Sequence, residues 1–191
     1  MQKYLRPILA GVAVTFVTAV ILGALLGPDF STIFFSALFG CATAYILANL
    51  AGNRKIASAS AAERDAALAL TPPAGQALLV VYRTGYVAKL AGLNLALDGR
   101  EFVQLTAPKF ATLAAPPGAH TLTAAFGGFA GAQAKAASYA FEAPADGVVA
   151  LRLSPQFGWV QGGVKVTPET DLAAVRNKLA GMPMALAAAA S

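Results

Sequence analysis

The sequence contains very little of the chemistry on which metal sites and covalent frameworks depend. Its 191 residues include one cysteine, Cys41, and one histidine, His120. A disulfide framework, a Cys/His zinc site and a two-histidine haem or pigment clamp are therefore excluded within a single chain. We expect the protein to hold no metal and no cofactor.

Charged residues are also scarce, and they are unevenly distributed. They make up 12% of the chain, about half the share of an ordinary soluble domain, whereas hydrophobic residues make up 57%. Residues 1–53 contain only Lys3, Arg6 and Asp29, and all other charges lie between residues 54 and 178. This division predicts a membrane-embedded N-terminal part followed by one small domain with its own core.

Two uncharged apolar runs of membrane-spanning length lie near the N-terminus. They cover about residues 7–26 and 30–50, and about 20 apolar residues suffice to cross a bilayer. We therefore predict a two-span transmembrane hairpin within residues 1–53. A cleaved signal peptide is disfavoured, because the first run is too long and no small-residue cleavage site follows it. A lipobox at Cys41 is disfavoured because this cysteine lies in the middle of the second run.

Lysine and arginine residues flank both runs, whereas the turn between them carries only Asp29. Basic flanks stay on the cytoplasmic side when loops are short. We therefore expect a protein of the bacterial inner membrane with both termini in the cytoplasm, and a periplasmic C-terminal domain is the alternative. The flanking residues are Lys3, Arg6, Arg54, Lys55 and Arg64.

Small residues recur every four positions in both runs, which places them on one face of each predicted helix. They are Gly11, Thr15, Ala19, Gly23 and Gly27 in the first run, and Thr32, Ser36, Gly40, Ala44, Ala48 and Gly52 in the second. Such faces let another helix backbone approach closely, so we expect them to be helix-packing surfaces. Neither run contains an acidic, basic or histidine residue, which argues against an ion pathway or a proton relay.

The rest of the chain divides into a linker, a β-domain and a tail. Residues 54–75 are polar and proline-rich and predict a linker, with a short helix capped by Ser58 or Ser60. Residues 76–181 show period-two alternation between turn signals, which predicts a small antiparallel β-sandwich or barrel of seven or eight strands. Residues 182–191 are an alanine-rich tail that we expect to fray.

Local signals within the predicted β-domain are more specific. Asp98-Gly99 predicts a two-residue hairpin loop, which would place Leu95 opposite Phe102. Thr167-Pro168-Glu169 predicts the N-cap and first turn of a C-terminal helix. The apolar stripe of that helix would be Leu172, Val175 and Leu179.

Three short segments of this domain are similar to a known family. They are residues 80–85 (VVYRTG), 95–99 (LALDG) and 115–122 (APPGAHTL). Together they resemble the bacterial DUF2846 domain over about residues 76–180. The resemblance implies a β-rich domain of uncharacterised role, with no catalytic residues to carry over. Domains of that family commonly look exported or lipid-anchored, so the resemblance leaves the periplasmic alternative open.

No segment predicts a reaction centre. His120 lies beside Leu122 on an apolar strand face and is expected to be structural, and an enzyme would require a pocket that brings His120 next to an acidic residue. The glycine-rich segment 125–131 lacks the Gly-Lys-Ser/Thr ending of a phosphate loop and predicts a mobile connection. The dispersed basic residues argue against nucleic-acid binding.

We therefore expect a non-catalytic, membrane-anchored binding or assembly module whose β-domain docks a partner near the bilayer. The alternative is an accessory subunit of a larger integral-membrane complex, which packs its small-residue helix faces on other subunits. Expected partners are membrane lipid and other membrane proteins or a second copy of the chain. The residues expected to contact a partner or lipid are Arg54, Lys55, Tyr82, Arg83 and Trp159.

Overall fold

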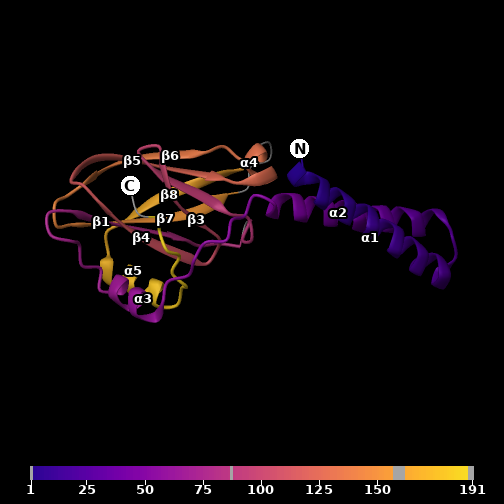
Figure 1. Ribbon diagram of the computed structural model, residues 1–191, viewed down its shortest axis with the longest axis horizontal. Helices are drawn as coiled ribbons and strands as arrows, with labels where there is room; N and C mark the ends of the chain where they lie inside the picture. Colours follow the sequence, from indigo (N-terminus) through magenta and orange to yellow (C-terminus); the bar gives the residue numbers. More distant parts are fainter. Residues whose placement is uncertain (1, 87, 157–161, 189–191) are drawn as a thin grey trace. The chain divides into compact units, whose positions relative to one another are not determined.

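The computed structural model describes residues 2–86, 88–156 and 162–188 and divides the chain into two compact units. The first is Met1–Gly52 and the second is Asn53–Ser191 (Figure 1). The division falls at the end of the second apolar run, and each unit has its own packing.

The first unit is a pair of long helices, α1 (Gln2–Leu26) and α2 (Phe30–Leu50). Both are long and apolar enough to cross a membrane. The chain reverses at Gly27, whose φ of +95° is accessible to glycine without strain. Asp29 then caps α2 by accepting a hydrogen bond from the Thr32 N–H at 2.8 Å.

The two small-residue faces meet inside this hairpin. A Cβ atom added to Gly11 would lie 2.7 Å from both the Ala44 Cβ and the Gly40 carbonyl oxygen, so only glycine permits this backbone approach. The contact is looser nearer the turn, where no described atom lies within 4 Å of a Cβ added to Gly23. Thr32 and Ser36 are buried. The half-buried positions of the two faces are Thr15, Ala19, Gly23, Gly27, Ala44, Ala48 and Gly52.

The second unit is a β-sandwich of two four-stranded sheets (Figure 1). One sheet has the order β4-β1-β7-β8 and the other has the order β3-β2-β5-β6. The strands are β1 (Ala77–Arg83), β2 (Leu93–Leu97), β3 (Arg100–Leu105), β4 (Lys109–Ala115), β5 (Gly118–Phe126), β6 (Ala137–Ala143), β7 (Val148–Gln156) and β8 (Gly163–Glu169). The main core lies between the sheets and includes Leu79, Val81, Leu93, Leu95, Leu122 and Leu151.

The strand arrangement differs from the expectation of a wholly antiparallel domain. β1 and β7 pair in parallel, with Leu78 opposite Val148, and the chain visits the other sheet twice between them. Alternation of apolar residues reports which face of a strand is buried but carries no information about strand direction. All other strand pairs are antiparallel.

A second apolar cluster covers the outer face of the β4-β1-β7-β8 sheet. Helices α3 (Ala61–Leu68) and α5 (Leu172–Ala180) lie side by side there (Figure 1). Val80 and Tyr82 of β1 pack with Val175 and Leu179 of α5, and all four are buried. Both faces of β1 are therefore covered, which explains the nearly continuous apolar sequence of this strand.

The N-cap of α3 agrees with the sequence prediction, whereas the N-cap of α5 does not. Ser60 caps α3 and forms a capping box with Glu63, as the linker sequence suggests. The N-cap of α5 is Asp171 and not the expected Thr167, because residues 167–169 are the last residues of β8. The carboxylate of Asp171 accepts a hydrogen bond from the Ala174 N–H at 3.0 Å.

The expected linker and tail both pack onto the β-sandwich. Met184 lies beside Phe110 at the edge of β4, and Ser58 pairs antiparallel with Ala185. The Ala185 N–H donates to the Phe110 carbonyl at 2.8 Å, and both Met184 and Ala185 are buried. The two segments cover the β4 edge, whose backbone groups would otherwise lack partners. The described parts of the linker and of the tail thus belong to the same compact unit as the sandwich, Asn53–Ser191.

Two loops also depart from expectation. Asp98 and Gly99 have φ values of 50° and 82° and form the predicted two-residue loop. A bulge at Leu95/Ala96 shifts the pairing, so Leu95 lies opposite Val103 and not opposite Phe102. The glycine-rich connection contains a short helix, α4 (Gly128–Gln133), where only a mobile loop was expected.

Candidate functional site

Arg83 is the most deeply buried charged residue of the β-domain and not a surface contact. Its guanidinium donates hydrogen bonds to the carbonyl oxygens of Leu105, at 2.8 Å, and of Ala88 and Ala91. It also stacks 5.3 Å from the centre of the Phe126 ring. Burial lowers the pKa of Arg83 to about 10. The expected partner contact at Arg83 is therefore corrected: this side chain ties the β1–β2 loop to the end of β3.

Tyr82 is also buried, on the opposite face of β1. Its ring lies 5.7 Å from the Lys178 Nζ atom of α5, and burial raises its pKa to about 12. The expected surface contact at Tyr82 is thus corrected to core packing between the sheet and α5. Aromatic residues are common at protein interfaces, but they are equally suited to packing between a sheet and a helix, so residue type alone did not distinguish the two environments. Trp159, the other aromatic candidate, lies outside the described residues.

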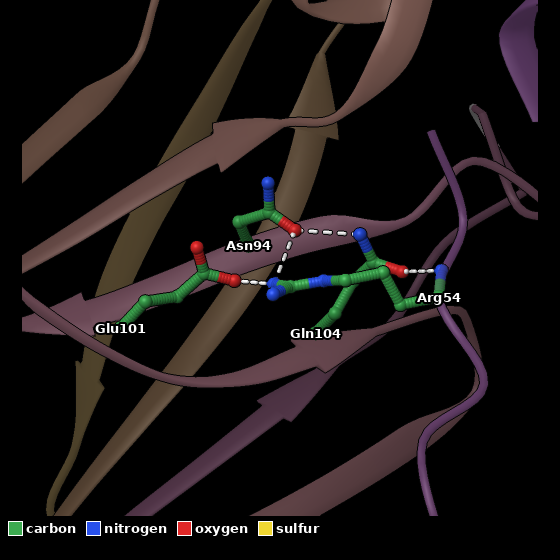
Figure 2. Close-up of polar contacts among 4 residues, drawn as sticks. All are labelled: Arg54, Asn94, Glu101 and Gln104. Carbon is green, nitrogen blue, oxygen red and sulfur yellow. Dashed lines mark hydrogen bonds and ion pairs between the residues drawn. The ribbon is translucent and has the colours of Figure 1, made fainter. Parts of the chain in front are cut away.

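Arg54 lies at the centre of a polar network on the β2–β3 hairpin (Figure 2). Its backbone N–H donates to the Gln104 side-chain oxygen at 2.7 Å, and its guanidinium contacts Asn94 at 3.3 Å and forms an ion pair with Glu101. Gln104 is buried and donates to the Asn94 side-chain oxygen at 2.6 Å. This network fixes the first residues of the domain to the sheet.

Asn53 holds the β1–β2 loop in a second set of contacts. Its side-chain amide donates to the Leu90 carbonyl at 2.7 Å, and its side-chain oxygen accepts from the Gly92 N–H at 2.6 Å. A Cβ on Gly92 would overlap the end of the Gln104 side chain, so a larger residue there would displace the Gln104 amide from this network. Asn53 and Gln104 belong to no recognisable motif, and no signal in the sequence could have found them.

A shallow hollow of about 310 Å³ lies beside this network. Arg54, Lys55 and Glu101 supply its charged groups, and Phe102, Leu186 and Ala188 supply apolar surface. Lys55, expected from the sequence to contact a partner, thus lies at the edge of a surface of mixed polarity. Within residues 2–86, 88–156 and 162–188 no group of three or more metal-ligating side chains occurs. The residues that line this hollow could recognise a partner by shape and charge.

His120 lies next to an acidic residue, which the sequence could not show. Its Nδ1 is 2.6 Å from the Asp98 carboxylate and its Nε2 is 2.8 Å from the Pro116 carbonyl oxygen. Both neighbours accept hydrogen bonds, so the ring satisfies both only as an imidazolium that donates from each nitrogen. The hydrogen bond to Asp98 is the main reason that the pKa of His120 is raised.

The same contact lowers the pKa of Asp98, whose other oxygen accepts from the Thr121 N–H at 2.8 Å. His120 therefore joins the Asp98-Gly99 hairpin to the proline turn that follows β4. In this arrangement neither ring nitrogen has a lone pair with which to accept a proton from a substrate.

No family model, no curated protein and no solved structure matches this chain. The resemblance to DUF2846 stays a prediction. Inferences about function therefore depend on the geometry described above: the helical hairpin, the network around Arg54 and the contacts of His120.

Proposed function

We propose that this protein is a non-catalytic, membrane-anchored binding or assembly module. The α1–α2 hairpin anchors it in the bilayer, and the β-domain presents a docking surface close to the membrane. We place it in the bacterial inner membrane with both termini in the cytoplasm, on the basis of the basic flanks, and a periplasmic β-domain is the alternative.

The observation that carries the anchor is the outer surface of the hairpin. The two helices direct their large apolar side chains outward around their whole length, while small residues fill the contact between them. In water such a surface would be an aggregation liability, and in a bilayer it faces lipid tails at no cost. The outward residues include Leu9, Phe16, Val20, Leu25, Phe30, Phe34 and Leu38.

The covalent connection supports a domain that works near the membrane. Only Ala51 and Gly52 separate the last residue of α2 from Asn53, which is already hydrogen-bonded within the β-domain. Three peptide steps reach at most about 11 Å. A partner in the same bilayer therefore meets the domain at a high effective concentration.

The environment of His120 supports binding rather than acid–base catalysis. Its two nitrogens are engaged by Asp98 and Pro116, and its ring packs 5.9 Å from the ring of Phe141. A general base needs a nitrogen directed at the substrate. A folded His120→Ala protein that had lost a measurable turnover would overturn the non-catalytic proposal.

The accessory-subunit alternative now takes a narrower form. The small-residue faces contact one another within the chain at Gly11, Gly40 and Ala44. Other subunits would therefore pack on the outward faces that carry large apolar residues, and not on the small-residue faces.

Topology is tested by single cysteines in a Cys41→Ala chain. Ser31→Cys, in the first turn of α2, reports the turn end of the hairpin and Ala145→Cys reports the β-domain, and both native residues are exposed. An impermeant thiol reagent added to intact spheroplasts should label the turn and not the domain. Labelling of the domain alone would establish the inverted topology, and labelling of neither or both would contradict the two-span anchor.

Docking is tested by site-specific photo-crosslinking of the full chain in its native membrane. A photoreactive residue at Lys55 should capture a specific membrane protein or a second copy, whereas the same residue at Lys178 on α5 is the control. Equal and non-specific capture at both positions would contradict the docking proposal.

A further inference from the structure

Three loops and the first residue of the β-domain form one end of the sandwich. The β1–β2 loop contacts the β3–β4 loop through the Ala107 N–H, which donates to the Lys89 carbonyl at 3.1 Å. The Gly127 N–H, at the start of the β5–β6 connection, donates to the Gly92 carbonyl at 3.0 Å. Asn53 bonds to the same β1–β2 loop. We name this end, where the chain enters the domain, the entry end.

Large exposed apolar side chains of the β-domain concentrate at the entry end. Tyr86 is 89% exposed and Leu90 is 63% exposed, and Phe129 of α4 is 41% exposed. Among the described residues of the domain, Leu172 is the one other large apolar side chain in this class. Single exposed apolar residues are ordinary, but three at the same end of the sandwich give that end an apolar character.

The charges of the domain are polarised along the same axis. Residues 84–92, 106–109 and 127–136 contain Lys89, Lys109 and Lys135 and no aspartate or glutamate. The opposite end, where β1 begins, carries Asp98 and Asp146 and also Arg100, which follows the Asp98-Gly99 turn. The entry end is therefore basic and apolar, whereas the far end carries charges of both signs.

We infer that the entry end is a lipid-docking surface for an anionic bilayer. Tyr86 and Leu90 insert at the level of the headgroups, and Lys89 contacts lipid phosphate. The inference rests on the proposed membrane anchor, and it adds a second, independent contact between the β-domain and the same bilayer.

Three features favour lipid over a protein partner. Asn53, the third residue after α2, bonds directly to this loop, so only Ala51 and Gly52 separate the entry end from the proposed membrane-spanning helix along the chain. A surface with several lysines and no acidic residue complements an anionic leaflet. Tyrosine beside lysine, here with the Lys89 Nζ 5.6 Å from the Tyr86 ring centre, is typical of membrane interfaces.

The test uses the full chain reconstituted in vesicles of phosphatidylglycerol and phosphatidylcholine, with one environment-sensitive thiol probe per protein. The probe is placed on native Cys41, or in a Cys41→Ala chain on Leu90→Cys or Ala145→Cys. Cys41 reports insertion of α2, Leu90 reports the entry end and Ala145 reports the far end. Lipids that carry a quencher near the headgroup should quench the Leu90 probe and shift its emission to the blue, and leave the Ala145 probe unchanged.

The Cys41 probe separates the two ideas that this experiment involves. If a quencher at the bilayer centre reaches Cys41 while the Leu90 probe behaves like the Ala145 probe, the lipid-docking inference is overturned and the anchor stands. If the Cys41 probe is not quenched, the anchor fails, and the inference fails with it.

Charge and apolar contributions are resolved by two further variants that carry the Leu90→Cys probe. Lys89→Gln should lower the ratio of docked to undocked domain roughly five-fold in anionic vesicles, and raised salt should have a similar effect. Tyr86→Ser should lower that ratio in anionic and in zwitterionic vesicles. Arg176→Gln on α5, remote from the loops of the entry end, is the matched control, and an equal effect of Lys89→Gln and Arg176→Gln would contradict the inference.

Discussion

The helical hairpin and the β-domain differ in which side chains they bury. In the hairpin, Thr32 and Ser36 are buried while Phe16 and Phe30 are more than two-thirds exposed. In the β-domain the order is reversed, and leucine and valine side chains such as Leu93 are fully buried. The two units are built from similar apolar residues, but they pack them in opposite ways.

This difference shows which force holds each unit. The β-domain gains stability by removing apolar surface from water, at about 25 cal/mol per Å². Between helices in a bilayer, where we propose that the hairpin lies, that gain is absent, and close backbone contact at small residues replaces it. Loss of volume should therefore damage the domain, whereas gain of volume should damage the hairpin.

The largest expected effect is at Arg83, the buried cation of the domain. Arg83→Met keeps most of the side-chain volume but leaves the carbonyl groups of Ala88, Ala91 and Leu105 without their donor. Each unpaired buried group costs about 1–3 kcal/mol, so we expect a loss of about 3–5 kcal/mol in unfolding free energy. Urea unfolding of the full chain in mild detergent, followed by circular dichroism of the sheet signal, measures this loss.

The matched control for Arg83 is Arg152→Met, which removes a partly exposed ion pair with Glu169. Exposed pairs contribute about 0–1 kcal/mol, so this variant should unfold almost as the parent does. Equal losses from the two variants would show that the three carbonyl contacts of the buried Arg83 guanidinium do not contribute the stability that we expect of them.

The next effect tests whether the C-terminal segment belongs to the domain. Met184→Ala removes a buried side chain that packs on Phe110 at the β4 edge. Loss of a buried methionine costs about 2–5 kcal/mol, and this edge site should fall at the lower limit. Ala188→Ser, at an exposed position of the same segment, is the control. An unchanged urea midpoint for Met184→Ala would instead support the expectation from the sequence that this segment frays and does not stabilise the domain.

The hairpin should respond to added volume at one glycine and not at another. Gly40→Leu forces a side chain against Thr15 and the Gly11 backbone, while a Cβ atom at Gly23 has no described neighbour within 4 Å, so a leucine there starts in open space. Overpacking costs about 1–3 kcal/mol. An SDS titration of the α1–α2 contact, followed by energy transfer between the helices, should show early separation for Gly40→Leu alone. Equal separation in both variants would indicate that the small-residue faces contact something other than each other.

Local patterns in the sequence predicted the elements of both units well. Two long apolar helices, a β-rich sandwich, the loop at Asp98-Gly99 and the cap at Ser60 all follow from the types and spacing of neighbouring residues. The start of α5 was misplaced because Thr167-Pro168-Glu169 suits both a helix N-terminus and the end of an edge strand. Tertiary pairing with β7 decides between the two readings.

The candidate site was much harder to predict, because its contacts join residues far apart in the chain. An arginine is usually found at a protein surface, so the sequence suggests that Arg83 is exposed. Its burial becomes evident only from the carbonyl groups of other residues that surround it in the fold. Asn53 reaches Leu90 and Arg54 reaches Gln104, and neither pair has a sequence signature. The contact between His120 and Asp98 depends on the register of β2 against β5, which alternation alone leaves undetermined.

The smallest expected effect concerns pH and the two turns that His120 joins. The pKa of His120 is raised, chiefly by its hydrogen bond to Asp98, and Glu142 also contributes. The stabilisation is therefore fully present below the unfolded pKa of about 6.5 and is lost as pH rises through the higher folded value. Because the pKa of Asp98 is lowered, its contribution is present above about pH 4 and is lost as pH falls through the folded value.

The His120–Asp98 contact should therefore contribute most between about pH 4 and pH 6.5. His120→Gln should lower the unfolding free energy by about 1 kcal/mol at pH 6 and by progressively less at higher pH, as the parent loses the imidazolium. Asp98→Asn tolerates the positive φ of this turn and removes only the charge, so it should weaken the pH dependence without opening the hairpin. Urea midpoints of the parent, His120→Gln and Asp98→Asn, measured from pH 5 to pH 9, test these expectations. The hairpin unit contains no histidine, so its SDS midpoint should stay constant over the same range, and a parallel shift in both units would assign the pH dependence elsewhere.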